Sequence, residues 1–187
     1  MRAQPGTWLL WLLGACAGQG GESQRSAADS APRALDSAAT WTVGMQRAGA
    51  IRYGMTVAEA RAATGDSLAG APAGEACGYV APEGAPEGFG AMVEQDRVVR
   101  VDVDSPGIPT DRGAVVGTGE AEIRRLYPDS LESMPHKYET AGRYLIVVPT
   151  SAAESGHRII FELGRDGRVI RYRAGLRPAV EYVERCG

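Results

Sequence analysis

Apolar and polar residues alternate along several short runs, which is typical of β-strands with one buried face. In the first half of the chain these runs are 77–81, 89–94 and 97–104, and in the second half they are 137–138, 143–148, 157–163 and 168–174. Turn signals separate the last two runs of each half, Gln95-Asp96 in the first and Gly164-Arg165-Asp166-Gly167 in the second. The pattern predicts two antiparallel meanders.

A short helix is predicted before each meander. Thr56 is a good N-cap, and Glu59 three residues later completes a capping box. This helix runs to about Thr64 and stops at Gly65, whereas the second covers 119–127 and stops before Pro128. The expected fold class is therefore α+β, with two helix-plus-meander units that form a sheet with helices on one side.

The two halves also resemble each other in sequence. Residues 54–68 and 117–131 align without a gap and are identical at seven of fifteen positions. Residues 96–101 match 166–172 when one glycine is inserted. Two matches in the same order favour a tandem repeat of about 65 residues. We expect the first α+β repeat at 41–110 and the second at 111–187.

The N-terminus reads as an export signal. Arg2 precedes the apolar run Trp8–Leu13, which is far shorter than the ~20 residues of a membrane-spanning helix. The run ends in Leu13-Gly14-Ala15-Cys16, which resembles a bacterial lipobox. The resemblance implies that residues 1–15 are removed and that the thiol of Cys16 carries a diacylglyceryl anchor in the lipid bilayer. The alternative is an ordinary signal peptide with an accidental cysteine.

Residues 16–40 are expected to be the lipidated cysteine and a tether. They are rich in Gly, Ala, Ser and isolated charges, so they cannot bury enough surface to offset chain entropy. About 24 flexible residues span roughly 25–30 Å, which would hold a folded part beginning at Trp41 just off the membrane. Ala17 follows the cysteine where an Asp would resemble an inner-membrane retention signal. An outer-membrane lipoprotein of the bacterial cell envelope is favoured, facing either the periplasm or the outside.

Two cysteines remain if Cys16 is acylated. In an exported protein, Cys77 and Cys186 most simply form a disulfide. The closed loop of about 110 residues would stabilise the fold by ~4–5 kcal/mol in the chain-entropy model. Two free thiols are the alternative.

Composition and motifs exclude several function classes. The formal charge of −3 argues against nucleic-acid binding through a positive field. Two His and three Cys leave few metal sites, and no Gly-x-Ser-x-Gly or His-Glu-x-x-His motif occurs. Gly117-x-Gly119 lacks the third glycine of a dinucleotide loop. We expect no cofactor and no metal, and a chain that is not an enzyme.

The segment Ile51-Arg52-Tyr53-Gly54-Met55-Thr56-Val57-Ala58-Glu59-Ala60 resembles the opening of the SmpA/OmlA outer-membrane lipoproteins. Its tandem duplication is similar to the β-lactamase-inhibitor-protein superfamily. Segments 92–94, 100–104 and 135–138 also resemble uncharacterised bacterial lipoproteins. These resemblances imply protein binding or envelope assembly and no chemistry.

One candidate binding site is centred on Pro135-His136-Lys137-Tyr138, which holds the chain's single Lys. Tyr138 would anchor a partner, with His136 as a pH-sensitive contact. Tyr144, Arg171 and Tyr172 are expected to join them on a concave sheet face. The alternative is a strand entrance with an exposed basic pair.

Two charged clusters are ambiguous. Asp102 and Asp104 share a strand face, which favours a solvated face over a cation site. A basic cluster follows in the second half, formed by Arg165, Arg168, Arg171, Arg173 and Arg177. It is either a stripe for an anionic partner or a set of charges that the acidic pair neutralises.

The sequence thus favours a membrane-anchored, non-catalytic binding module for a protein or envelope component. An envelope-assembly accessory of SmpA/OmlA type is one alternative. A small hydrolase that uses His136 or His157 is another.

Overall fold

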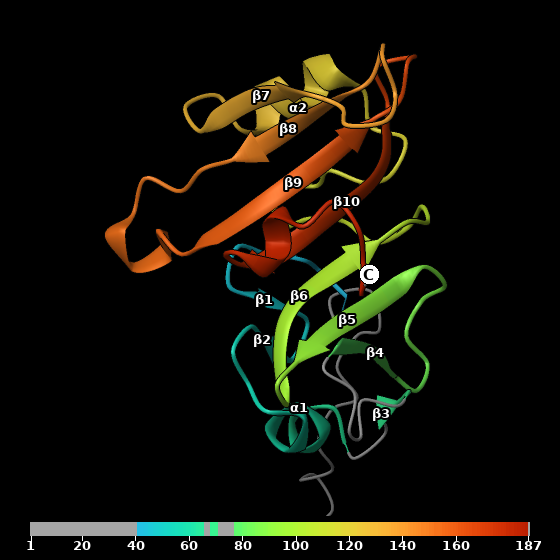
Figure 1. Ribbon diagram of the computed structural model, residues 1–187, viewed down its shortest axis with the longest axis vertical. Coiled ribbons are helices and arrows are strands. Elements are labelled where there is room, and N and C mark those ends of the chain that lie inside the picture. Colours follow the sequence, from blue (N-terminus) through green and yellow to red (C-terminus); the bar gives the residue numbers. More distant parts are fainter. Residues whose placement is uncertain (1–40, 66–67, 71–76, 187) are drawn as a thin grey trace, which may run out of the picture. The chain divides into compact units, whose positions relative to one another are not determined.

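The computed structural model describes residues 41–65, 68–70 and 77–186 (Figure 1). The predicted signal peptide at 1–15, Cys16 and the tether at 16–40 lie outside these residues. Within the described ranges, no helix is both long and apolar enough to cross a membrane.

One eight-stranded antiparallel sheet spans both halves of the chain, with two short helices packed against it, which confirms the α+β class (Figure 1). Its strands, in spatial order, are β3 (Leu68–Ala69), β4 (Cys77–Pro82), β5 (Phe89–Glu94), β6 (Arg97–Val103), β10 (Val169–Leu176), β9 (His157–Leu163), β8 (Arg143–Val147) and β7 (Leu131–Pro135). A separate ribbon pairs β1 (Arg47–Ala48) with β2 (Ile51–Arg52). The helices are α1 (Val57–Ala63) and α2 (Glu120–Leu126), and two 3-10 turns follow, η1 (Ala152–Glu154) and η2 (Ala179–Glu181).

The main hydrophobic core lies on one face of this sheet, which we call the core face. Val101 and Val103 of β6, Tyr172 and Ala174 of β10 and Phe161 of β9 point into it and are fully or almost fully buried. The single buried residue of each helix, Ala60 in α1 and Ile123 in α2, joins the same cluster. Both helices therefore bury one narrow stripe each against the same core.

The predicted turns and strands are largely confirmed. Gln95 and Asp96 form a two-residue turn with φ of 47° and 63°, the left-handed values that a tight hairpin needs. Strands β4, β5, β6, β8, β9 and β10 fall on predicted runs. The prediction of a strand at 137–138 is wrong, because the strand before β8 is β7 and ends at Pro135. Proline donates no ladder hydrogen bond, and the chain turns directly after it.

The capping box of α1 is confirmed. Thr56 Oγ1 accepts a hydrogen bond from the Glu59 N–H at 3.2 Å, and Glu59 Oε2 accepts one from the Thr56 N–H at 2.8 Å. The backbone hydrogen bond to Thr56 is the largest cause that lowers the pKa of Glu59. By contrast, α2 starts at Gly119 without a side-chain cap.

Thr56→Ala is therefore expected to lower the free energy of unfolding by about 1 kcal/mol, since two N-terminal N–H groups lose their partners. The shift in the urea midpoint at pH 7 measures this. Thr118→Ala is not a neutral control, because its hydroxyl accepts from the Val115 N–H. The exposed Thr140 in the β7–β8 loop is a suitable control position.

Each half makes the same contacts where its helix meets its last strand. Arg97 Nη1 donates to the carbonyl of Gly54 at 2.7 Å, and Arg168 Nη1 donates to that of Gly117 at 2.9 Å. Both glycines have positive φ, 91° and 96°. The backbone bridges Thr56 to Arg97 and Gly119 to Arg168 occupy matching positions.

Candidate functional site

The opposite face of the sheet, which we call the outer face, is crossed by the C-terminal segment. Residues 177–186, here the strap, leave β10, form η2 and run in front of β10 and β6 (Figure 1). Contacts join η2 to β10, β9 and β6. The side chains beneath the strap are Arg100, Asp102, Arg173 and Glu162, which are 1–7% exposed. The outer face thus combines buried charges with a main-chain cover.

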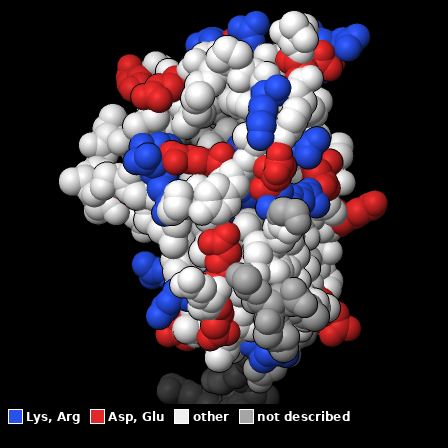
Figure 2. All heavy atoms as spheres, viewed as in Figure 1, with Lys and Arg blue, Asp and Glu red and all other residues white. Residues whose placement is uncertain are grey.

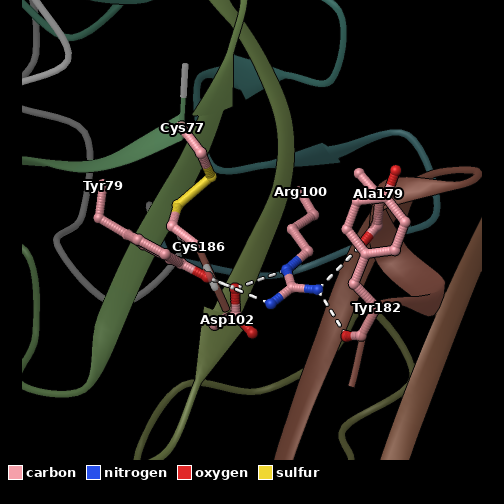
Figure 3. Close-up of a disulfide and its surroundings, with 7 residues drawn as sticks. All are labelled: Cys77, Tyr79, Arg100, Asp102, Ala179, Tyr182 and Cys186. Atoms are coloured by element: carbon pink, nitrogen blue, oxygen red, sulfur yellow. Dashed lines mark hydrogen bonds and ion pairs between the residues drawn. A yellow bond between two sulfur atoms is a disulfide. The ribbon is translucent and has the colours of Figure 1, made fainter. Parts of the chain in front are cut away.

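Arg100 is the centre of the first buried network (Figure 3). Its Nε donates to Asp102 Oδ2 at 2.9 Å, and its Nη1 donates to the carbonyls of Ala179 and Tyr182, both at 2.8 Å. Tyr79 Oη donates to the same Asp102 oxygen at 2.7 Å. Burial, followed by the Asp102 carboxylate, raises the pKa of Tyr79 to about 12. The network leaves the buried guanidinium paired and ties the strap to β6.

The predicted disulfide between Cys77 and Cys186 is confirmed (Figure 3). It joins β4 to the end of the strap across a sequence separation of 109 residues. Arg185 next to it pairs with Asp104 at 2.7 Å, and its guanidinium lies 5.6 Å from the Tyr79 ring centre. The strap is therefore held covalently and electrostatically on the first-half side of the sheet.

A second network lies on the second-half side. Glu162 accepts from Arg171 at 3.3 Å and from His136 Nε2 at 2.8 Å, and Arg173 Nη1 lies 3.7 Å from it. Arg173 Nε also donates to the carbonyl of Val180 at 2.6 Å. Burial and the nearby Arg100 lower the pKa of Arg173. The ion pairs among these strands thus form a continuous charged floor beneath the strap.

His136 has both ring nitrogens engaged. Nδ1 accepts from the backbone N–H groups of Tyr138 and Glu139, at 3.0 and 2.9 Å. Nε2 must then carry the proton that it shares with Glu162, and the ring stacks on Tyr144 at 4.7 Å. This geometry makes His136 a positioning residue for the loop after β7 and leaves no nitrogen to take a proton from a substrate.

His157 stands apart at the start of β9, with its ring 6.3 Å from that of Tyr53. In the hydrogen bonds of the described residues, neither histidine contacts a hydroxyl or a thiol. The hydrolase alternative therefore gains no assembled catalytic group from this geometry.

Two hollows flank the strap on the second-half side of the outer face. The first, of about 610 Å³, is lined by His136, Tyr138, Glu139, Glu162, Gly164, Arg165, Asp166, Ile170, Arg171, Val183, Glu184 and Arg185. The second, of about 490 Å³, is lined by Met134, Pro135, Lys137, Tyr144, Ile146, Ile160, Arg173, Glu181 and Val183. Both volumes fall within the range of ligand and side-chain pockets. Of the six predicted binding residues, five line these hollows: His136, Lys137, Tyr138, Tyr144 and Arg171.

Exposed apolar side chains gather around the same hollows. The large hydrophobic residues that the described part of the chain exposes most are Met134, Tyr138, Ile170 and Tyr182, at 53, 63, 41 and 41%. The first three line the hollows and the fourth lies on the strap. Glu184 accepts from Tyr138 Oη and from Lys137 Nζ, and these bonds lower the pKa of Glu184. The rim is thus aromatic, apolar and pinned by hydrogen bonds.

Tyr172 does not belong to this surface. It is 1% exposed on the core face, where its hydroxyl donates to the carbonyl of Ile108 at 2.8 Å. A register shift between Val169 and Arg171 puts Val169 and Tyr172 on one face and Arg171 and Arg173 on the other. Strict alternation from Val169 therefore assigned the faces incorrectly.

The two charged clusters neutralise each other and their surroundings. Asp102 pairs with Arg100 and Asp104 with Arg185, so the prediction that Asp102 lies on a solvated face is wrong. Each arginine of the basic cluster has a partner: Glu139, the Gly117 carbonyl, Glu162, the Val180 carbonyl with Glu162, and Glu181, in chain order. Figure 2 shows basic and acidic side chains interspersed over this view of the molecule. This geometry favours neutralisation over an anion-binding stripe.

Buried tyrosines predict a loss of stability at high pH. Burial raises the pKa of Tyr127 to about 12 and that of Tyr172 further. The unfolded chain releases these protons near pH 10 whereas the folded chain retains them, so the free energy of unfolding falls between about pH 10 and 12. Urea midpoints at pH 9, 10 and 11 measure this, and Tyr127→Phe should make the fall shallower. A midpoint that is constant from pH 9 to 11 would contradict the account.

No family model matches the chain, and no curated protein matches it. One solved structure is similar, described as the 1.5 Å crystal structure of an extracellular protein containing a SCP domain from Bacillus anthracis str. Ames. The match has a TM-score of 0.41 and 10% identity, and it covers 67% of this chain and 44% of that one. A likeness at this level carries no argument about function.

Proposed function

We propose that this chain is an exported, membrane-anchored lipoprotein whose folded part is a non-catalytic binding module for a protein of the cell envelope. The observation that supports this most strongly is the gathering of exposed Met134, Tyr138 and Ile170 around two hollows on one face. Tyr, Met and Arg are the residue types enriched in protein interfaces. We call the rim of the two hollows the docking surface.

The rigid floor of the docking surface is a further argument. His136 and Glu162 have side chains only 6% exposed, and they are bonded to each other and to neighbouring backbone. Anchors held in place before binding lose less conformational freedom in the complex. The polar contacts of Tyr138 with Glu184 and Lys137 likewise orient the most exposed aromatic ring.

The tandem-repeat organisation belongs to the same proposal. Two helix-plus-meander units at 41–110 and 111–187 would account for the matching Arg97–Gly54 and Arg168–Gly117 contacts. They would also account for the antiparallel pairing of β6 with β10 at the centre of the sheet. The resemblance to β-lactamase-inhibitor and SmpA/OmlA proteins is consistent with such units, and an envelope-assembly role is the alternative partner class.

Cross-linking in the producing organism tests the binding function. Tagged chain is cross-linked mildly, purified and identified with its partners by mass spectrometry. We expect a stoichiometric envelope protein with the wild type and at least about a tenfold loss with Met134→Ala/Tyr138→Ala, since central anchors contribute most of the binding energy. Arg61→Ala, exposed on α1, is the matched control. Equal recovery from the double variant and the control would refute the docking surface.

Lipid anchoring is tested at Cys16, which lies outside the described residues. We expect the wild type to incorporate labelled palmitate and to gain the mass of a diacylglyceryl group, and Cys16→Ser to do neither. Two or more acyl chains would make the anchoring stable rather than marginal. Equal labelling of both proteins would contradict the anchor, and Cys186→Ser is a cysteine control that should keep the label.

A further inference from the structure

We propose that the outer face carries a groove for an extended peptide, and that the strap fills this groove as an internal ligand latched by the Cys77–Cys186 disulfide. The inference deepens the proposed binding function, on which it rests, by naming the ligand class and its control. The ligand is a main-chain segment that presents one aliphatic side chain.

The strap is recognised as a peptide ligand would be. Arg100 and Arg173 donate four hydrogen-bonding contacts from fixed, buried positions, and three of them go to main-chain carbonyls, those of Ala179, Val180 and Tyr182. Carbonyl recognition does not depend on the side chains of the bound segment. These two arginines therefore form a ready-made cradle for extended or turned backbone.

One side chain of the strap supplies the apolar anchor. Val180 is 0% exposed and packs with Tyr144 and Ile160, with Ile146 and Val183 at the edge. This small cluster is separate from the main core, to which no residue of the strap belongs. The same cluster borders the 490 Å³ hollow, so the groove continues beyond the strap onto the docking surface.

The floor under the strap can be hydrated when the strap lifts. Arg100 with Asp102 and Arg173 with Glu162 remain paired with each other without the strap. A cover that only completed a core would lie over apolar side chains, whose exposure to water is unfavourable. Here only the Val180 cluster loses apolar contacts, so local opening need not unfold the sheet.

The disulfide makes this opening conditional. Cys77 and Cys186 are both partly exposed, so an attacking thiolate can reach the bond. A partner dithiol would form a mixed disulfide with one of them and release the other as a thiol. Its second thiol would then complete the exchange, so that the partner is oxidised to a disulfide as Cys77 and Cys186 are reduced. The strap is then held by non-covalent contacts alone and can be displaced.

Hydrogen–deuterium exchange of the full chain tests the latch. The amides of Arg177, Glu181 and Tyr182 donate to Gly156, Pro178 and Ala179 in the closed strap. On reduction with a phosphine we expect these amides to exchange at least about tenfold faster while those of β5 and β9 change less than about threefold, as for a local opening. An unchanged strap would overturn the proposal. Equal acceleration in the strap and in β5 and β9 would also overturn it, since the disulfide would then be a global staple.

A synthetic peptide of residues 177–185, labelled with a fluorophore, tests the groove. The receiving protein is the full chain with Val180→Asp and Cys186→Ser, in which the internal strap loses its anchor and latch. We expect this variant to bind the peptide at least about tenfold more tightly than the oxidised wild type does, since its groove is open. A peptide with Val180→Asp should lose binding by a similar factor.

Equal binding to both proteins, or no binding to the variant, would overturn the groove. A variant that fails to fold would do so as well, because the strap would then be part of the folding core. These outcomes are independent of the cross-linking test, which depends on Met134 and Tyr138 outside the strap. A partner recovered with an immobile strap would leave the proposed function standing and remove this inference alone.

Discussion

Arg100→Met is expected to lower the free energy of unfolding by about 3–5 kcal/mol, because it breaks a buried ion pair by removing one partner. Asp102, 7% exposed, would keep its charge beside Tyr79 without the guanidinium. The carbonyls of Ala179 and Tyr182 would lose their donor at the same time. Urea unfolding at pH 7 measures the change.

The double variant Arg100→Met/Asp102→Asn separates the unpaired charge from the lost packing. We expect it to recover at least about 1 kcal/mol relative to Arg100→Met, since the buried carboxylate no longer needs a counter-charge. Arg61→Met, on the exposed surface of α1, should change stability by less than about 0.5 kcal/mol. A loss below about 1 kcal/mol for Arg100→Met would mean that the network is solvated in solution.

Phe161→Ala is expected to cost about 3–5 kcal/mol through the cavity that it leaves in the core. Phe161 is 0% exposed and its ring centre lies 5.6 Å from that of Tyr127 and 5.7 Å from that of Tyr172. These rings pack in the core formed by both halves of the chain. The loss should appear as a lower thermal midpoint and as a lower urea midpoint.

Ile170→Ala is the matched control for this core substitution. Ile170 is 41% exposed on the neighbouring strand β10, on the rim of the larger hollow. We expect a change within about 0.5 kcal/mol, as for ordinary surface positions. Similar losses for both variants would show that the core is not centred where the structure places it.

Local signals carried most of the fold prediction. The Gln95-Asp96 turn, the Thr56–Glu59 capping box and the alternating strands need only neighbours in sequence, and the structure has them all. The cysteine pairing also followed from residue count and export, since two cysteines remained. These features depend on short-range chemistry that the sequence states directly.

The candidate site was predicted only in part because it depends on long-range contacts. Arg100 and Asp102 alternate along β6 like residues of a solvated face, and only the strap from residues 177–186 buries them. Nothing in the local pattern of the strap marks it as a cover. The Cys77–Cys186 pairing was the usable signal, because a chain that leaves β10 and returns to β4 must cross the strands between them.

Tyr172 and β7 show two further limits of pattern reading. One register irregularity in β10 reverses which face a side chain occupies, so period-two alternation fails beyond it. Strand β7 has four exposed residues out of five and is held by pairing with β8 rather than by burial. Hydrophobic pattern is silent about such an edge strand, which is why the strand was predicted at 137–138.

Site-specific photo-cross-linking tests the central claim, that the docking surface on the outer face binds a protein partner, most directly. A photoreactive phenylalanine analogue is placed at Tyr138, at Ile170 or, as controls, at Arg61 and Glu83 in the full chain. The account predicts one cross-linked species shared by positions 138 and 170, at least about tenfold above the controls, because only those positions would lie within the interface. Cross-links of equal yield at all four positions, or a discrete species at Arg61 alone, would contradict it.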